Sequence, residues 1–316
     1  MHIYRVGLVV MALLILAVGL ALVMPSWLRF LVTIALAKGL VVLSLLLLMR
    51  AGLVSFGHGL YYGLGAYAAG LSVNYLGIGD AIPLLLGGIA VAALVGWILG
   101  FLLARYREIF FAVLNLAFSM ILYGALVRSA ALGSTDGFGL PRPTFFGYRP
   151  VGDMVGLTMY MMTVIVVLAA GFAVYRYLRS ARGAVGEAIR ENELRVEYLG
   201  TSVYRLVHVK YVMSAALAGA GGALTAMTSG HIDPQVAYWT TSGEFVFVAI
   251  LSGTGHVAAP FVGALLFEAV RTFAFAYSPH TWQLVLGVTL LLVILFMPGG
   301  LWSLFTRARA GKDAAK

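Results

Sequence analysis

Long apolar segments alternate with short polar connections along most of the chain. A helix needs about 20 apolar residues to cross the hydrocarbon core of a bilayer, where every backbone polar group must be hydrogen-bonded within the segment. The chain repeats apolar segments of this length, which predicts an all-α bundle of membrane-spanning helices. The full-length segments expected are Val6–Met24, Phe30–Met49, Gly52–Val73, Ala81–Ala104, Ile109–Val127, Met154–Tyr175 and Tyr211–Met227.

The last part of the chain has shorter apolar segments. Gly243–Leu251 and Pro260–Phe275 are separated by SGTGHVAA, and Trp282–Met297 follows them. Both members of the pair are shorter than a full crossing, so they form either two short crossings or one re-entrant hairpin. Counted as two, they bring the total to about ten crossings in one polytopic transmembrane domain over residues 1–316.

The first apolar segment follows Arg5 and resembles a signal peptide at its start. No small-residue cleavage site follows, and MPSWLRF leads directly into the next apolar segment. We therefore expect an uncleaved helix here, with almost no chain before it.

Arg179–Val209 is the long charged stretch of the chain, and it lies between two apolar segments. Within it, GEAIRENELRVEYLG (Gly186–Gly200) predicts one short amphipathic helix that ends at Gly200, since glycine accepts the left-handed conformation of helix ends. Glu191 lies four residues before Arg195, the favourable order for a pair on a helix surface. A mostly apolar stripe is expected at i+3/i+4 spacing, formed by Val185, Ile189, Asn192, Val196 and Leu199.

Such a helix either docks against another protein or lies on an anionic membrane surface. Anionic headgroups would repel glutamates. The helix carries several of them, at Glu187, Glu191, Glu193 and Glu197. Docking to a protein is therefore the favoured interpretation.

The basic residues predict an orientation. Placing residues 179–209 in the cytoplasm also places Arg5, Arg50, Arg107 and a basic tail over residues 306–316 there. Most of the 21 Lys and Arg residues are then cytoplasmic, as the positive-inside rule requires, and both termini are inside. In a chain that is 62% hydrophobic and 10% charged, this topology explains the net charge of +9 better than nucleic-acid binding does. The same topology puts several acids on the outer face: Asp136, Asp153, Asp233 and Glu244.

Several kinds of site are excluded. The chain has no cysteine, so it forms no disulfide and no thiolate metal site. No G-x-x-x-x-G-K-[ST] phosphate loop occurs, so any nucleotide that drives this protein would be bound by another chain. No H-E-x-x-H, G-x-S-x-G or clustered His/Asp set occurs in an apolar segment, which disfavours an intramembrane enzyme. We expect no catalytic residue, cofactor or metal site.

The third apolar segment is rich in glycine, in SFGHGLYYGLGAYAAG. Small residues four apart, as at Gly59 and Gly63, are typical of close helix packing, which we expect for the individual glycines. Glycine-interrupted helices also line substrate paths, and that role is expected for the segment as a whole. His58 either lines such a path or is satisfied by a neighbouring carbonyl, and the second is favoured.

Lys38 and Glu268 are expected in the interior of apolar segments. A charge in hydrocarbon is costly unless it is paired or faces water, so each is a functional candidate. A structural ion pair, with each other or with a partner subunit, is favoured, because a proton relay would need more carboxylates within the spans.

Three stretches resemble signature sequences of one family and occur in that family's order. They are SFGHGLYYGLGAY (Ser55–Tyr67), AIRENELRVEYLG (Ala188–Gly200) leading into KYVMSAALAGAGGAL (Lys210–Leu224), and LSGTGHVAAPFVGAL (Leu251–Leu265). They are similar to stretches in the permease subunits of branched-chain amino acid ABC importers, of the LivM-type branch. The resemblance extends from Gly39 to Leu301.

The resemblance implies that Ala188–Gly200 is a coupling helix, which fits a groove of a cytoplasmic ATPase, within a cytoplasmic coupling loop over residues 179–209. The residues expected to couple to the ATPase are Glu187, Arg190, Glu191, Asn192, Glu193, Leu199 and Gly200. The candidates for the translocation path are Ser55, His58, Tyr62, Gly63, Thr254 and His256. The implied partners are a related LivH-type permease, two cytoplasmic ABC ATPase subunits and a periplasmic substrate-binding protein, at the inner membrane of a bacterium.

We therefore expect a permease subunit that translocates leucine, isoleucine, valine or a similar hydrophobic amino acid with energy from separate ATPase subunits. Urea, short amides and aromatic acids, which similar systems carry, remain open as substrates. The alternative is an autonomous ion-coupled carrier or channel for a small organic solute, which would need ion or proton sites at mid-membrane. Only Lys38 and Glu268 are clear candidates for that role.

Overall fold

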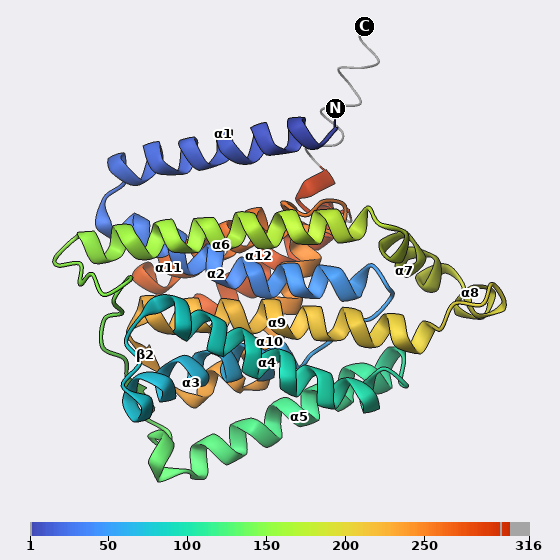
Figure 1. The fold of residues 1–316 in the computed structure, drawn as a ribbon, viewed down its shortest axis with the longest axis horizontal. Helices are drawn as coiled ribbons and strands as arrows, with labels where there is room; N and C mark the ends of the chain where they lie inside the picture. Colours follow the sequence, from blue (N-terminus) through green and yellow to red (C-terminus); the bar gives the residue numbers. More distant parts are fainter. Residues whose placement is uncertain (1, 298, 304–316) are drawn as a thin grey trace, which may run out of the picture.

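The computed structural model describes residues 2–297 and 299–303 and is almost entirely helical (Figure 1). The helices are α1 (His2–Val23), α2 (Ser26–Met49), α3 (His58–Leu76), α4 (Ala81–Leu103), α5 (Glu108–Arg128), α6 (Met154–Leu178), α7 (Ala181–Glu191), α8 (Glu193–Tyr198), α9 (Val203–Ser229), α10 (Trp239–Ser252), α11 (Ala259–Tyr277) and α12 (Trp282–Phe296). The short elements are the 3-10 helices η1 (Ala130–Leu132) and η2 (Pro234–Ala237) and the antiparallel strands β1 (Phe138–Gly139) and β2 (His231–Ile232). The expected all-α class is confirmed. The basic tail over residues 306–316 lies outside the described residues.

Every apolar segment expected to span the membrane forms a helix. The starting points of α3 and α9 differ most from expectation: α3 begins at His58 instead of Gly52, and α9 begins at Val203 instead of Tyr211. Gly52 has a φ of +76, which ends the helical conformation there and leaves residues 50–57 as an irregular connection. Within the described part of the chain, six helices are long and apolar enough to cross a membrane, namely α2, α4, α5, α6, α9 and α11.

Helix α9 passes through the middle of the bundle, with α2, α3 and α4 packed around it (Figure 1). Its small residues allow these close approaches. A Cβ at Gly221 would lie 2.6 Å from the carbonyl oxygen of Ala37 on α2, and one at Gly219 would collide with Ala92 on α4. Small residues in membrane helices let backbones approach in this way. The alanines and glycines of α9 therefore allow close packing against other helices of the same chain.

The glycines of α3 are packing positions, as expected. A Cβ at Gly65 would collide with the backbone of Gly219, and one at Gly59 would lie 2.7 Å from the hydroxyl of Ser242. The Gly59 N–H donates to that hydroxyl at 2.9 Å. Helix α3 is therefore held tightly between α9 and the start of α10.

Polar connections gather at the two ends of the bundle. At one end, β1, within the α5–α6 connection, pairs with β2 after α9, and Arg29 at the start of α2 forms an ion pair of 3.0 Å with Asp153. At the other end, α7 and α8 project from the bundle between α6 and α9 (Figure 1). The turn before α5 and the α10–α11 connection, residues 253–258, lie at this second end, because they contact α8 and the end of α2.

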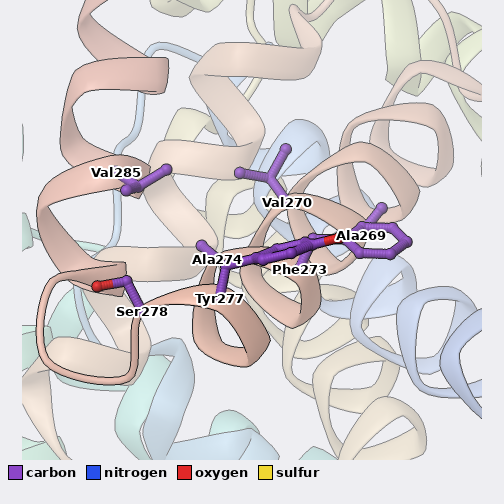
Figure 2. A pocket seen from close by; sticks show the side chains of 7 residues that line it. All are labelled: Ala269, Val270, Phe273, Ala274, Tyr277, Ser278 and Val285. Atoms are coloured by element: carbon purple, nitrogen blue, oxygen red, sulfur yellow. The ribbon is translucent and has the colours of Figure 1, made fainter.

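A wide groove of about 430 Å³ opens between α11 and α12 (Figure 2). Its lining is apolar except for Ser278 and the Tyr277 hydroxyl, and includes Ala269, Val270, Phe273, Ala274 and Val285. Lipid chains suffice to cover such a surface in a membrane, so the groove by itself indicates no ligand.

Candidate functional site

The charged segment folds as two helices, α7 and α8, instead of the single helix expected over Gly186–Gly200. The break is at Asn192, which has φ −160 and ψ 102 and whose side chain accepts a hydrogen bond from the Arg195 N–H at 2.9 Å. Asparagine at this position satisfies a backbone donor that the first turn of α8 would otherwise leave free. The sequence pattern treated Asn192 as part of a helix face, and that was wrong.

The break also separates Glu191 from Arg195, so the surface pair expected between them does not lie on one helix. The end of the segment agrees with expectation: Gly200 follows α8 with a φ of +81. Helical periodicity therefore predicts the helices α7 and α8 but not the break between them at Asn192.

The apolar side of the segment is buried in part. Ile189 on α7 is 5% exposed and Val196 on α8 is 4% exposed, and both belong to the largest hydrophobic cluster of the described chain. Leu199 was expected on the same stripe but is 79% exposed; α8 ends at Tyr198, and Leu199 lies beyond its last residue. Burial of Ile189 and Val196 attaches both helices to the bundle.

Two ion pairs reinforce this attachment. The Arg50 guanidinium donates to Glu187 of α7 at 2.9 Å. Arg107, just before α5, donates two parallel bonds to the carboxylate of Glu193 on α8, at 2.9 and 2.8 Å. Bidentate arginine–carboxylate pairs fix orientation as well as distance. Glu187 and Glu193, expected to contact an ATPase, thus hold the segment against its own bundle.

Arg50 connects three parts of the chain. Beyond its bond to Glu187, its side chain donates to the carbonyl oxygens of Thr254 and Gly255, each at 3.0 Å. The end of α2, the helix α7 and the α10–α11 connection therefore meet at one guanidinium. We call this set of contacts the Arg50 junction.

His256 lies in the same connection. Its imidazole stacks on the indole of Trp302, with ring centroids 4.6 Å apart. Partial burial, with a smaller contribution from the Arg50 charge, lowers the pKa of His256 below its ordinary value. The imidazole is therefore neutral at neutral pH, and it accepts a hydrogen bond from the Ala258 N–H at 3.1 Å.

Lys210 on α9 is a site residue that the sequence pattern did not indicate. Its ammonium is buried, with no hydrogen-bond acceptor among the residues that the structure describes. It lies beneath Gly186 of α7, where any larger side chain would collide with it, and 6.0 Å from the centre of the Tyr177 ring. The available signal was a lysine directly before an apolar segment, with a glycine in the preceding charged stretch. The contact needs tertiary structure to be recognised.

The outward surface of α7 and α8 combines charge with exposed apolar groups. Leu194, Tyr198 and Leu199 are 65%, 89% and 79% exposed. Arg190 and Glu191 on α7 are exposed as well. We call these five residues the α7–α8 face. Leu194 and Tyr198 were not among the expected contacts, because an amphipathic pattern assigns apolar residues to the buried side.

The six candidates for a translocation path do not share one accessible surface. Ser55 and His58 are fully buried, and His58 Nε2 is 2.7 Å from the Ser214 hydroxyl, which donates to the carbonyl of Ser44. A hydroxyl is therefore the partner of His58 Nε2, where a carbonyl was expected, and Nδ1 has no hydrogen-bond partner among the described residues. Tyr62 packs on the ring of Phe245, and Gly63 lies opposite Ala237. The remaining two, Thr254 and His256, belong to the Arg50 junction and its connection.

Lys38 and Glu268 form the ion pair expected between them, with 2.9 Å between Nζ and Oε2. Glu244, expected on the outer face, lies within α10 and lines the same small cavity as this pair. Asp153 and Asp233 have structural roles: the first pairs with Arg29, and the second caps η2.

Residues 26–294 match a family model described as branched-chain amino acid transport system / permease component. The chain is 28% identical over 273 residues to the high-affinity branched-chain amino acid transport system permease protein LivM of Escherichia coli (strain K12), which covers 79% of this chain and 64% of LivM. It is 26% identical over 264 residues to the permease protein BraD of Pseudomonas aeruginosa (79% of this chain, 86% of BraD) and 26% identical over 268 residues to LivH of Escherichia coli (strain K12) (79% and 85%).

The chain thus spans less than two thirds of the length of LivM. No solved structure is significantly similar to it. Since the family model covers most of the sequence, the chain belongs to the family of branched-chain amino acid transport system permease components.

Proposed function

We propose that this chain is the membrane permease subunit of an ABC importer for branched-chain or other hydrophobic amino acids. It performs no covalent chemistry, and separate ATPase chains hydrolyse the nucleotide, consistent with a sequence that lacks a phosphate loop. A related LivH-type permease completes the pore, and a periplasmic binding protein delivers the substrate. The family and the α7–α8 face support this function.

The observation that carries the proposal is a rigidly attached, partly apolar face on a short polar segment. Ile189 and Val196 bury its inner side, while Arg50 and Arg107 hold its two helices by ion pairs. A segment attached in this way moves as one body with the ends of α2 and α5. The ATPases are expected to bind the α7–α8 face, so that their closure displaces it.

The Arg50 junction gives that displacement a route to the pore. Because one guanidinium bonds to α7 and to the carbonyls of residues 254 and 255, a shift of α7 pulls on the connection between α10 and α11. Alternating access in transporters depends on such rigid-body movement of one group of helices against another.

The proposed topology has about ten crossings in a bacterial inner membrane, with both termini and the α7–α8 face in the cytoplasm. In support, the connections with the densest basic charge, at Arg50, Arg107 and residues 179–209, lie at one end of the bundle. Helix α10 has 14 residues and is counted as a short crossing.

Leu199→Asp tests the docking. The variant places a charge in the apolar part of the α7–α8 face, so binding of the ATPases and amino acid uptake should fall by about tenfold or more, as for a central interface residue. Val151→Asp is the matched control, since Val151 is 80% exposed in the connection between α5 and α6. Copurification of the ATPases with the assembled permease and uptake into proteoliposomes are measured. Equal binding by both variants and the unmodified chain would show that the ATPases dock elsewhere.

A further inference from the structure

Four charged side chains lie together on α2, α10 and α11. Lys38 pairs with Glu268 at 2.9 Å, and Arg271 lies 3.6 Å from Glu244. Lys38 is near the middle of α2, and Glu268 is near the middle of α11. We call Lys38, Glu244, Glu268 and Arg271 the charge quartet.

A structural role alone explains the quartet poorly. Charges within a bilayer are costly, and buried ion pairs are often replaced by apolar residues of similar volume without loss of stability. The side chains of the quartet are between 13% and 34% exposed in the isolated chain, so they are not sealed in the core. The Arg271–Glu244 separation is also long for a strong pair.

The surroundings of the quartet combine both charge signs with apolar walls. A small cavity of about 10 Å³ lies among Lys38, Glu244 and Glu268 and is otherwise lined by Val42, Phe245, Val248, Ala264 and Phe267. The cavity holds about one water molecule, so this conformation is closed to larger ligands. Phe245 contacts the ring of Tyr62 on the glycine-rich helix α3.

We propose that the charge quartet is a membrane-embedded binding site for a zwitterionic α-amino acid with an apolar side chain. When α2 and α11 separate, the substrate ammonium binds the carboxylates of Glu268 and Glu244, and its carboxylate binds Lys38 and Arg271. In the closed conformation the four charges pair with one another, so no charge is left unpaired in the membrane between substrates. The inference rests on the proposed importer function and names the chemistry that its path recognises.

Lys38→Met/Glu268→Gln tests the site in the full complex. Removing both charges leaves no unpaired ion. If the Lys38–Glu268 pair is only structural, uptake should therefore stay near that of the unmodified chain. The proposed site predicts that uptake falls by about tenfold or more, while copurification of the ATPases and their stimulation by substrate-loaded binding protein remain. Arg29→Met/Asp153→Asn, which neutralises an ion pair at the end of the bundle, is the control and should retain uptake.

Lys38→Glu/Glu268→Lys separates the two roles again. The exchanged pair restores a structural ion pair but reverses the charges offered to the substrate, so uptake should stay low. Uptake that returns to the level of the unmodified chain overturns the proposed site. Loss of the partner permease from either double variant also overturns it, because that loss would identify the quartet as an interface between subunits. If the unmodified complex hydrolyses no ATP and moves no amino acid, the importer function itself fails.

Discussion

Arg50 is the residue at which the most distant parts of the chain meet. Its side chain joins the end of α2 to Glu187 on α7 and to two carbonyls between α10 and α11. Charge-assisted bonds of this kind are directional, and a guanidinium makes several at once. The same residue was counted in the sequence only as part of the positive-inside bias, because nothing along the chain indicates its partners.

Arg50→Met should uncouple ATP hydrolysis from transport. The side chain keeps its apolar stem but loses all its donors, so α7 no longer moves with the α10–α11 connection. Uptake per ATP hydrolysed is expected to fall by about tenfold, equivalent to ~1.4 kcal/mol of coupling. Uptake and ATPase rate are measured in the same proteoliposomes, with Arg149→Met on an exposed connection as the control. An unchanged ratio would contradict a role for the junction.

At the scale of elements, the division of the charged segment into α7 and α8 decides which residues face outward. Had the helix been continuous, Leu199 would have shared a buried stripe with Ile189 and Val196. The cap formed by Asn192 instead starts a separate short helix that ends at Tyr198, with Val196 buried and Leu199 exposed beyond its end. The same break leaves Glu193 aligned with Arg107.

Asn192→Ala should loosen α8 without unfolding the bundle. The substitution removes the side-chain acceptor of the Arg195 N–H, a loss of about 1 kcal/mol for a helix N-cap. Amide hydrogen exchange over residues 193–198 is therefore expected to speed up by about fivefold, while exchange in α9 stays the same. Asn192→Asp keeps an acceptor and should exchange like the unmodified chain. Slower exchange in the alanine variant would show that the segment prefers one continuous helix.

At the scale of the whole molecule, the ends of the bundle differ in chemistry. One end has the Arg50 junction, the Arg107–Glu193 pair and the α7–α8 face, and the other has the β1–β2 pair and the long α5–α6 connection. The central helix α9 joins the two ends, with glycines that bring α2, α3 and α4 close to it. The proposed function uses this asymmetry: the ATPases would bind at the first end and the periplasmic binding protein at the second.

The proposed orientation is testable because the chain has no cysteine. Leu199→Cys and Phe146→Cys each introduce a single thiol at an exposed position, in opposite ends of the bundle. A membrane-impermeant maleimide added to intact cells should label the Phe146 variant and should label the Leu199 variant only after the cells are opened. The reverse pattern would invert the topology and exclude cytoplasmic docking.

The sequence by itself determined the class of the protein, the succession of its helices and its family. Apolar length and periodicity suffice for the class and the helices, because a helix in lipid must satisfy its own backbone and bury its apolar surface. The family follows from the signature stretches, which periodicity does not provide. The pairing of Lys38 with Glu268 was also predicted from the sequence, since charges in the membrane interior need partners.

Tertiary structure alone decided how the polar residues are used. Glu187 and Glu193 hold the charged segment to the bundle through Arg50 and Arg107, and Lys210 lies buried under Gly186, because these residues, distant in sequence, are adjacent in space. Glu244 joins Lys38 and Glu268 around one cavity for the same reason. The helical periodicity of the sequence predicts which residues share a helix face. Which residues this face contacts depends on how the other helices pack against it.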